Sequence, residues 1–412
     1  MAEAEFGTPE RPASVMGVCL IYGFSIISMA FVGMIVPIVG MIAARLNTAP
    51  SEIGFAIALY SAPSALLAIV GGSIVDRIGT HLTILGGAAL IVVADMFAYA
   101  ATSLTIFNFA MLIGGIGFTG ITIAAPALII ATTRDSFRTR AMSVWSTYAP
   151  TGFSLGLLIA APFAGGTLWH IVPAVHGTLM LLLMASAALL PRARATAVNR
   201  GSARDQLFTF FGVFRNLRLM RLAFAIAVAN GIAYGTSIAA PSYLARVDHV
   251  SMATSATTVA FAKILAMILA GLGMGELLSR RTNPFILYLI ATAAGIAAQF
   301  VLFWPVSGFP VAATALGVWL LSYGCLASIG MALLPDLLQS MRQPGLGSGV
   351  VGQLTSLASF IAAQVYLGLD GWESFFTIAV AGLSIAVILL PARLQGRGLT
   401  EEIGAPMEPI VQ

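Results

Sequence analysis

Long apolar stretches recur along this chain, and they constrain its fold more than any other feature. Each has about 20 or more residues, enough to cross roughly 30 Å of hydrocarbon as an α-helix. Helix is required because lipid offers no partner for unpaired backbone N–H and C=O groups. The runs also lack the apolar–polar alternation of a membrane β-barrel. With 59% hydrophobic and only 9% charged residues, the chain is predicted to be an all-α membrane protein.

The runs divide into twelve predicted transmembrane helices, an even number that puts both termini on one side of the membrane. An Arg-rich segment at 192–218 separates two six-helix bundles, 15–191 and 219–392, and the tails are 1–14 and 393–412. The predicted spans are 15–44, 52–74, 82–102, 105–132, 141–165, 168–190, 219–244, 252–277, 283–304, 309–335, 346–367 and 372–392.

The arginines indicate which side holds the termini. Of the loops on the opposite side, only two carry arginine, Arg45 and Arg246, whereas the remaining loops, the central segment and the tails hold the others. Cytoplasmic loops carry the excess of Lys and Arg. We therefore expect a multi-pass protein of the cytoplasmic membrane with both termini in the cytoplasm. The net charge of +4 follows from this orientation and calls for no nucleic-acid partner.

The two halves share residues at a constant offset, which indicates a duplication. Trp169 and Trp372 open the sixth and twelfth spans, 203 positions apart. The same offset relates the loop after the second span to the loop after the eighth, through the pairs Gly72 and Gly275, Asp76 and Ser279, and Arg77 and Arg280. The second copy keeps the basic residues and loses the aspartate.

The segment 71–81, GGSIVDRIGTH, carries the strongest motif. Glycine allows close helix approach and a positive φ at a turn, here at Gly79. Alone, the segment is read equally well as a structural turn. Together with twelve spans and a duplicated chain, it resembles the signature loop of the major facilitator superfamily. That resemblance implies two six-helix bundles rocking about a central site. It also implies gating roles for Gly72, Asp76, Arg77 and Gly79, and for Arg280 and Arg281 in the second copy.

The fifth span offers a weaker family signal. Gly152 to Gly156 followed by Ala161-Pro162 resembles the Pro-Gly pattern of the superfamily's antiporter branch, although close helix packing explains it equally well. Many proton-coupled members carry an arginine in the fourth span at the position of Met111. This departure weighs against drug/proton antiport.

Lys263, the only lysine in the chain, lies near the middle of the eighth span. A cation there costs about 2.5–3.5 kcal/mol on insertion scales. Its helical face carries small residues, while the opposite face, with Phe261 and Leu265, suits lipid. We expect Lys263 to point into protein or a cavity and to bind an anionic solute, the alternative being a structural ion pair or a snorkelling side chain. At the 203-residue offset, the equivalent position in the first half is Tyr60.

Two further ionisable residues lie within spans, Asp95 in the third and His176 in the sixth. Both spans are peripheral in the family's fold, so a structural role is favoured for each, with proton coupling as the sharper hypothesis. Neutral polar residues on the expected cavity helices complete the candidate substrate-binding set. With Lys263 and Tyr60, the set comprises Tyr22, Tyr148, Asn230, Tyr234, Tyr323 and Gln353.

These features predict a secondary transporter for a small organic anion, such as a carboxylate or a carboxylate-bearing chelate. Efflux of hydrophobic or cationic compounds is the alternative, and a membrane-embedded enzyme or receptor is a distant third. The sequence contains no nucleotide-binding P-loop, metal-ligand cluster or nucleophile–base pair, so we expect no enzyme activity, cofactor or metal. We expect a monomer in the lipid bilayer, coupled to a proton or another ion gradient.

Overall fold

The structure is a computed structural model that describes most of the chain. The described residues are 13–134, 137, 141, 144–145, 147–192, 216–280, 282–339 and 344–390. The side chains at 67–74, 76–77, 275, 279, 334–339 and 344–349 lie outside the description. Most of the two tails and of the central segment also lie outside it, so those predicted boundaries stay predictions.

Twelve helical spans follow one another along the described chain. Ten are long and apolar enough to cross a membrane, and α3 and the shorter apolar helix α7 complete the set. The fold class predicted from the sequence is confirmed. The helices are α1 (Val15–Ile35), α2 (Val39–Leu46), α3 (Pro50–Ile78), α4 (Thr80–Ala100), α5 (Leu104–Thr132), α7 (Tyr148–Ala160), α8 (Val172–Ala185), α10 (Leu217–Val247), α11 (Met252–Ser279), α12 (Pro284–Phe303), α13 (Phe309–Gln339), α14 (Pro344–Leu367) and α15 (Trp372–Leu389).

Short 3₁₀ segments interrupt some spans. The segment η1 (Val36–Ile38) separates α1 from α2 within the first span, and Pro37 accounts for the break because proline has no N–H to donate. The segment η2 (Ala161–Phe163) ends α7 at Pro162 in the same way. Two more, η3 (Thr167–Ile171) and η4 (Ala187–Leu189), flank α8.

Polar residues outside the apolar runs fix several helix starts. Ser14 accepts a hydrogen bond from the Gly17 N–H at the start of α1, and Ser251 does the same for Thr254 in α11. Such caps pair backbone donors that would otherwise lack a partner. This is why several predicted and observed starts agree within two residues.

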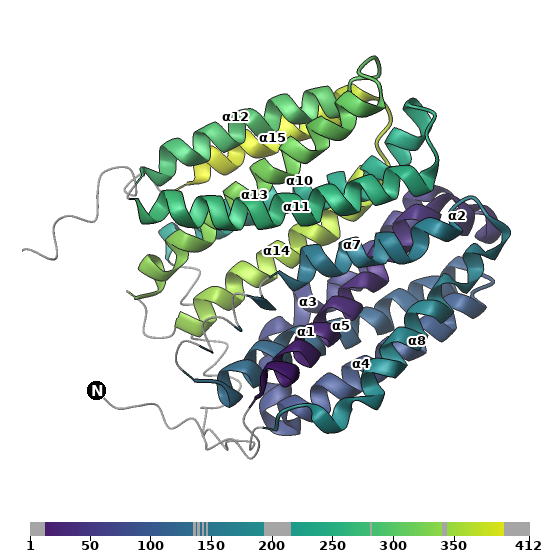
Figure 1. The fold of residues 1–412 in the computed structure, drawn as a ribbon, viewed down its shortest axis with the longest axis vertical. Coiled ribbons are helices and arrows are strands. Elements are labelled where there is room, and N and C mark those ends of the chain that lie inside the picture. The colour runs from purple at the N-terminus through teal and green to yellow at the C-terminus, as the bar shows by residue number, and fades with distance from the viewer. Residues whose placement is uncertain are drawn as a thin grey trace, which may run out of the picture.

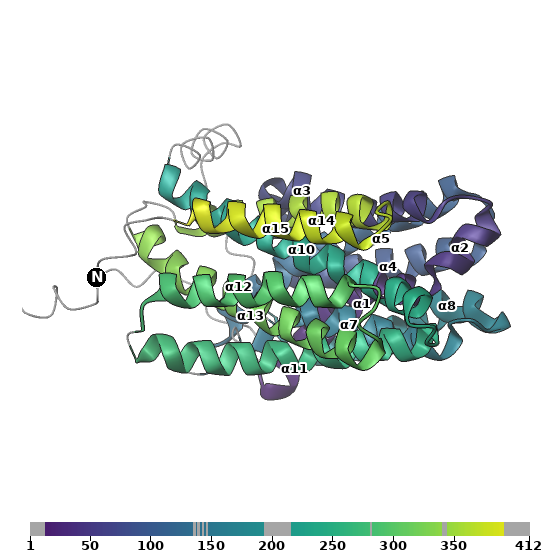
Figure 2. The ribbon, with the colours of Figure 1, turned by 90° about the horizontal axis from the view of Figure 1, so that it is seen from above.

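The helices form two bundles with a limited set of contacts between them. In Figure 1 the C bundle (α10–α15) lies above the N bundle (α1–α8). The helices of both bundles run along one common direction in Figure 2. The bundles meet where α3 packs on α14 and α7 on α11. The contacts of η1 with α10 and α11, and of η2 with α11, close the end of the bundles opposite the start of α1 at Val15. We call this the far end.

Within the N bundle, α1 and α7 touch backbone to backbone. A Cβ on Gly33 would collide with the Phe153 carbonyl oxygen, and one on Gly156 with that of Ala30. The glycines of the Gly152–Gly156 segment therefore serve close helix packing, the plainer of the two interpretations of that pattern. This packing places Phe153 at the bundle interface.

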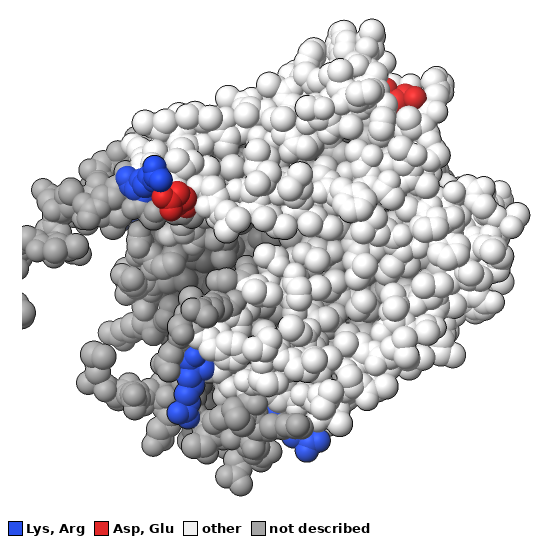
Figure 3. Space-filling model, in the orientation of Figure 1, with Lys and Arg blue, Asp and Glu red and all other residues white. Residues whose placement is uncertain are grey.

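The outer surface is apolar. In the face shown in Figure 3, the coloured charged side chains lie near the two ends of the molecule. Large side chains such as Leu66, Leu182 and Leu272 are well exposed. This distribution is expected for helices surrounded by hydrocarbon.

Candidate functional site

Lys263 lies at the contact between the two bundles. Its side chain is buried, with 6% exposed, and its Nζ donates a hydrogen bond of 3.0 Å to Ser237 Oγ on α10. The Nζ also lies 4.2 Å from the centre of the Phe153 ring on α7, in the other bundle. Among the described residues, no carboxylate forms an ion pair with it. The cation is held by a hydroxyl and a π face alone.

The faces of α11 follow the sequence prediction in most positions. Phe261, Leu265 and Leu272 are exposed, whereas Ala256 and Ala260 are fully buried. Gly271, one of the small residues on the same helical face as Lys263, is exposed instead. Lys263 therefore points into protein, as predicted, rather than snorkelling along the lipid face.

Two more of the predicted substrate-binding residues lie at the interface between the bundles. The ring of Tyr234 on α10 lies 6.0 Å from that of Phe153. Gln353 on α14 donates from Nε2 to the Ala65 carbonyl oxygen on α3, at 2.7 Å. The amide thus links the C bundle to the backbone of the N bundle.

Asn230 and Tyr323 are brought together inside the C bundle. Tyr323 donates from Oη to Asn230 Oδ1 at 2.8 Å, and Asn230 donates from Nδ2 to Ser359 Oγ at 3.0 Å. This chain joins α10, α13 and α14, and it fixes the orientation of the amide. All three side chains are half-buried.

In the N bundle, Tyr22 and Tyr148 lie on a half-buried aromatic wall. Tyr22 Oη is 2.7 Å from Thr147 Oγ1. The Tyr148 ring stacks on Trp145 at 4.8 Å, and Trp145 Nε1 donates to Ser25 Oγ at 3.1 Å. This wall presents rings, whereas the C bundle presents an amide and hydroxyls.

Tyr60, which is equivalent to Lys263 at the 203-residue offset, is only 1% exposed. Its hydroxyl donates to the Ser28 carbonyl oxygen on α1, and its ring stacks on Phe31 at 5.4 Å. The structure therefore places it inside the N bundle, with its hydrogen bond already made.

Asp95 and His176 meet in the N bundle, a pairing that the sequence analysis did not foresee. His176 Nδ1 lies 2.8 Å from Asp95 Oδ2 and 3.0 Å from Oδ1. The other ring nitrogen, Nε2, lies 2.8 Å from the Ile27 carbonyl oxygen on α1. The pair is almost fully buried and joins α4, α8 and α1.

The residues predicted to control gating lie at the end of the molecule opposite the far end. Gly72, Asp76 and Arg77 belong to α3, which stays helical to Ile78, so the predicted loop is shorter than expected. The turn falls at Gly79, with φ 92°, as the motif predicted.

The second copy of the motif is placed in part. Arg280 forms an exposed pair with Glu276, with 2.8 Å between Nε and Oε1. Arg281 and the side chains of Asp76 and Arg77 lie outside the described residues.

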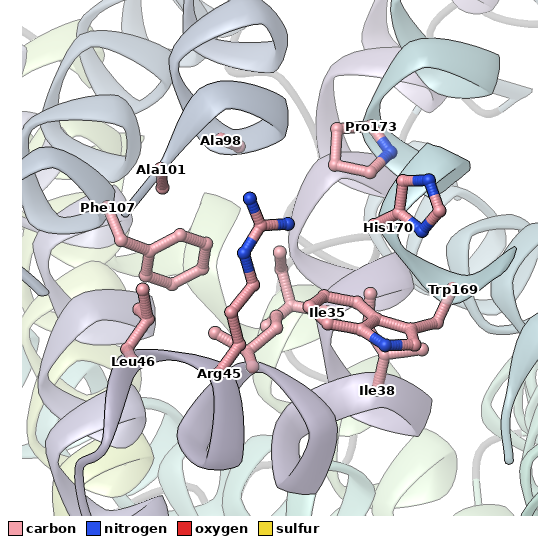
Figure 4. Close-up of a pocket in the computed structure, with 11 residues that line it drawn as sticks. Ile35, Ile38, Arg45, Leu46, Ala98, Ala101, Phe107, Trp169, His170 and Pro173 are labelled. Carbon is pink, nitrogen blue, oxygen red and sulfur yellow. The ribbon is translucent and has the colours of Figure 1, made fainter. Parts of the chain in front are cut away.

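A small pocket opens at the far end of the N bundle (Figure 4). Its cavity volume is about 20 Å³, enough for a water molecule. The Arg45 guanidinium points between Ala98 and Pro173 in this view, and it lies 5.8 Å from the centre of the Trp169 ring. The pocket is distinct from the surroundings of Lys263.

The chain belongs to the Major Facilitator Superfamily, whose family model matches residues 18–363. The inner membrane transport protein YajR of Escherichia coli K12 is 23% identical over 399 residues, covering 93% of this chain and 83% of that protein. The multidrug resistance protein MdtL of Escherichia coli O157:H7 is 24% identical over 404 residues, covering 93% and 98% respectively. The resemblance drawn from the motif is confirmed. The protein is a multi-pass membrane transporter of small molecules and not an enzyme.

Solved structures share the fold at low identity. The nucleoside transporter NupG superposes with a TM-score of 0.70 at 13% identity, covering 92% of this chain and 99% of that one. A bacterial homologue of the human lysosomal transporter Spinster, in an inward-facing and unoccupied conformation, gives 0.67 at 15% identity, covering 92% and 94%. These similarities concern the architecture alone.

Phe153 and Ser237 are the neighbours of Lys263 that sequence reasoning missed. Neither is unusual in a spanning helix, and only their contacts reveal them. An ammonium between a hydroxyl and a ring retains hydrogen-bonding capacity, because Nζ carries three donors. The site can therefore attract an anion that enters between the bundles.

Proposed function

We propose that this protein is a secondary transporter that carries a small organic anion by alternating access. The observation that supports this most strongly is Lys263, a buried cation with no carboxylate partner among the described residues. Leaving a charge so placed is costly unless a ligand compensates for it. A carboxylate, alone or as part of a chelate, supplies the missing charge.

The remaining candidate residues complete the proposal. The solute's carboxylate binds Lys263, and its body lies between the aromatic wall around Tyr22 and Tyr148 and the polar chain of Asn230 and Tyr323. Tyr234 and Gln353 line the bundle interface nearby. Tyr60 lies behind this wall, because its ring packs on Phe118, which in turn packs on Tyr148. Rocking of the bundles is controlled by Gly72, Asp76, Arg77 and Gly79, with Arg280 and Arg281 in the second copy.

The orientation follows from charge. We propose that the termini are cytoplasmic, with the boundaries 1–14, 15–191, 192–218, 219–392 and 393–412, and that the protein acts as a monomer. The contacts of η1 and η2 close the far end, so the conformation is the one that opens toward the cytoplasm. A proton or another ion gradient supplies the energy, because the sequence has no nucleotide-binding P-loop.

A ligand screen followed by transport tests this proposal. We expect carboxylates, but not cations or neutral drugs, to raise the melting temperature of the purified protein, because a ligand that binds the native state stabilises it. The best ligand is then offered to proteoliposomes. Lys263→Gln should remove both the thermal shift and uptake, whereas Thr258→Val on the same helix should keep both. A bound carboxylate that Lys263→Gln still transports at the wild-type rate overturns the assignment.

Efflux of hydrophobic or cationic compounds is the second candidate. The aromatic wall and the Pro162 pattern at the end of α7 favour it, and the relative MdtL is named as a multidrug resistance protein. Deletion of the gene should then sensitise cells to several unrelated drugs. Unchanged sensitivity across a broad panel would count against this candidate and leave the anion proposal in place.

A further inference from the structure

The Asp95–His176 pair takes no part in the solute site proposed above, yet it buries two ionisable groups in a spanning bundle. Its hydrogen bonds stay inside the N bundle, whereas Lys263 lies at the bundle interface. A buried ion pair is weak evidence for stability, since desolvation offsets much of the attraction. Ionisable residues inside membrane helices more often mark ion or proton pathways.

Both nitrogens of His176 face acceptors. The carboxylate of Asp95 lies against Nδ1, with both oxygens within 3.0 Å, and a backbone carbonyl lies against Nε2. A neutral imidazole has one N–H and one lone pair. One of these contacts would then set a lone pair against an oxygen. With Asp95 ionised, both contacts are therefore satisfied only when each ring nitrogen carries a proton, which makes a charge-assisted pair.

The far-end pocket lies close to this pair. Its lining includes Ala98 on α4 and Pro173 on α8. Each is three positions from one member of the pair, Asp95 or His176, and so lies about one helical turn, roughly 5 Å, nearer the far end. Arg45 points between these two helices (Figure 4). A water molecule in this pocket would lie about one turn from the buried carboxylate.

The pair is also connected to α1. The carbonyl that accepts from His176 belongs to Ile27. One turn further along, Phe31 meets the imidazole edge-on, with ring centres 5.5 Å apart. On the other side of the bundle α1 packs backbone to backbone on α7, which carries Phe153. A change at His176 therefore acts on the helix that positions the partner ring of Lys263.

We propose that Asp95 and His176 form a proton-binding site, filled from the far end through the Arg45 pocket, whose occupancy sets the position of α1. Loading transfers one proton from hydronium in the pocket, so that an O–H bond breaks and the imidazole N–H at Nδ1 forms. Unloading leaves a lone pair against the carboxylate and favours separation of α8 from α4.

The other titratable or charged groups around the pair are few within the described residues. Arg45 and His170 line the pocket, Tyr99 lies against His170, and Tyr60 stacks on the far side of Phe31. Among these, Arg45 carries a fixed charge near the entry. The coupling of this site to transport rests on the function proposed above; the proton site itself does not.

Nitrogen NMR of the full-length protein in nanodiscs, with ¹⁵N-labelled histidine, tests the proton site without any solute. The chain has four histidines, and His176→Gln assigns the signal. We expect His176 to carry protons on both nitrogens at neutral pH, and Asp95→Asn to leave a proton on Nε2 alone. A single neutral tautomer in the wild type would overturn the proposal, whatever the protein transports.

Two matched variants on α4 test whether protons reach the pair through the pocket. Ala98→Leu fills the pocket without touching the pair, whereas Ala100→Leu changes an exposed residue of the same helix outside the pocket lining. We expect Ala98→Leu to slow exchange of the His176 Nδ1 proton with water at least tenfold, and Ala100→Leu to leave it unchanged. Equal rates in both variants would overturn entry by this route. These variants also carry the test if Asp95→Asn fails to fold.

Coupling is measured with the carboxylate found in the ligand screen. Asp95→Asn and His176→Gln should lose accumulation driven by a pH gradient but keep solute exchange across proteoliposomes, which needs no net proton movement. Loss of both activities in folded protein would assign the pair a structural role. If no carboxylate binds, the function proposed above fails while the NMR result stands on its own.

Discussion

The two bundles treat buried charge in opposite ways. Among the described residues, the N bundle buries Asp95 and His176 against each other, whereas the C bundle buries the single charge of Lys263 and leaves it facing the other bundle. The first arrangement is complete within one bundle. The second is complete only when the bundles meet or when a solute arrives. We infer that the two halves have different tasks.

The repeat sharpens this difference. At the 203-residue offset, the positions of Asp95 and His176 correspond to Ala298 on α12 and Ala379 on α15, both buried, and those two helices are in contact. The position of Lys263 corresponds to Tyr60. Each half has therefore kept or gained ionisable groups where the other has neutral ones. We infer that the halves diverged in charge while they kept a common fold.

The largest effect is expected on breaking the N-bundle pair. Asp95→Asn leaves His176 buried without its counter-ion, which costs about 3–5 kcal/mol of unfolding free energy. The double variant Asp95→Asn with His176→Gln restores two neutral groups that can hydrogen-bond, and should recover most of the loss. Denaturation in detergent measures both. Equal loss in the single and double variants would show that the charges do not compensate each other.

Lys263→Gln should affect binding more than stability. Losing a hydrogen bond to a charged group costs about 1.5–3 kcal/mol, so affinity for the carboxylate should fall roughly 10- to 150-fold. Unfolding free energy should stay the same or rise, because the buried cation is removed. Isothermal titration and denaturation of the same sample separate the two. A marked loss of stability without a change in affinity contradicts the assignment and favours a structural cation.

Exchanging residues at equivalent positions of the two halves tests how tightly each bundle is packed. Gly156 corresponds to Ser359 at the same offset. Gly156→Ser forces a side chain into the α1–α7 backbone contact and should cost about 1–3 kcal/mol. Ser359→Gly removes one acceptor of Asn230 and should cost about 0.5–1.5 kcal/mol. Melting temperatures rank the two, and the reverse order would show that α1 and α7 separate easily.

The smallest effect is expected at Arg280. Its pair with Glu276 is exposed, at 72% and 61% of the two side chains, and such pairs contribute about 0–1 kcal/mol. Arg280→Gln should barely change the melting temperature at moderate salt. Its effect on transport rate, compared with that of Arg77→Gln, reports whether the second copy of the motif still controls rocking. Equal effects on rate would contradict the idea that this copy has decayed.

The spans were predictable because hydrocarbon thickness sets a length that a single sequence records directly. Most predicted ends fall within a few residues of the helices. Much of the predicted start of the fifth span lies outside the described residues, and at its other end α7 and η2 reach Phe163, close to the predicted 165. The break at Pro37 was missed, because the apolar run continues through it. Hydropathy reports burial in lipid and not the continuity of the helix.

Only those features of the site that depend on a single helix could be predicted from the sequence. The inward direction of Lys263 followed from the period of α11, but its partners Ser237 and Phe153 lie on other helices. Asp95 and His176 were each noticed as isolated polar residues in apolar spans. They are 81 positions apart, and no periodicity within either span relates them. Contacts between helices depend on rotation and packing, which the pattern along each helix leaves undetermined.

Because the chain has a single lysine, Lys263 can be labelled selectively with an amine-reactive reagent. An amine-reactive reagent has only two targets in this chain, the N-terminus and the Lys263 amine. Because Lys263 is covered by Phe153 when α7 and α11 meet, its modification rate measures how often that contact opens. A bound carboxylate should protect the same amine. Mass spectrometry of the single peptide that contains Lys263 can therefore follow both solute binding and opening of the contact, without any substitution in the chain.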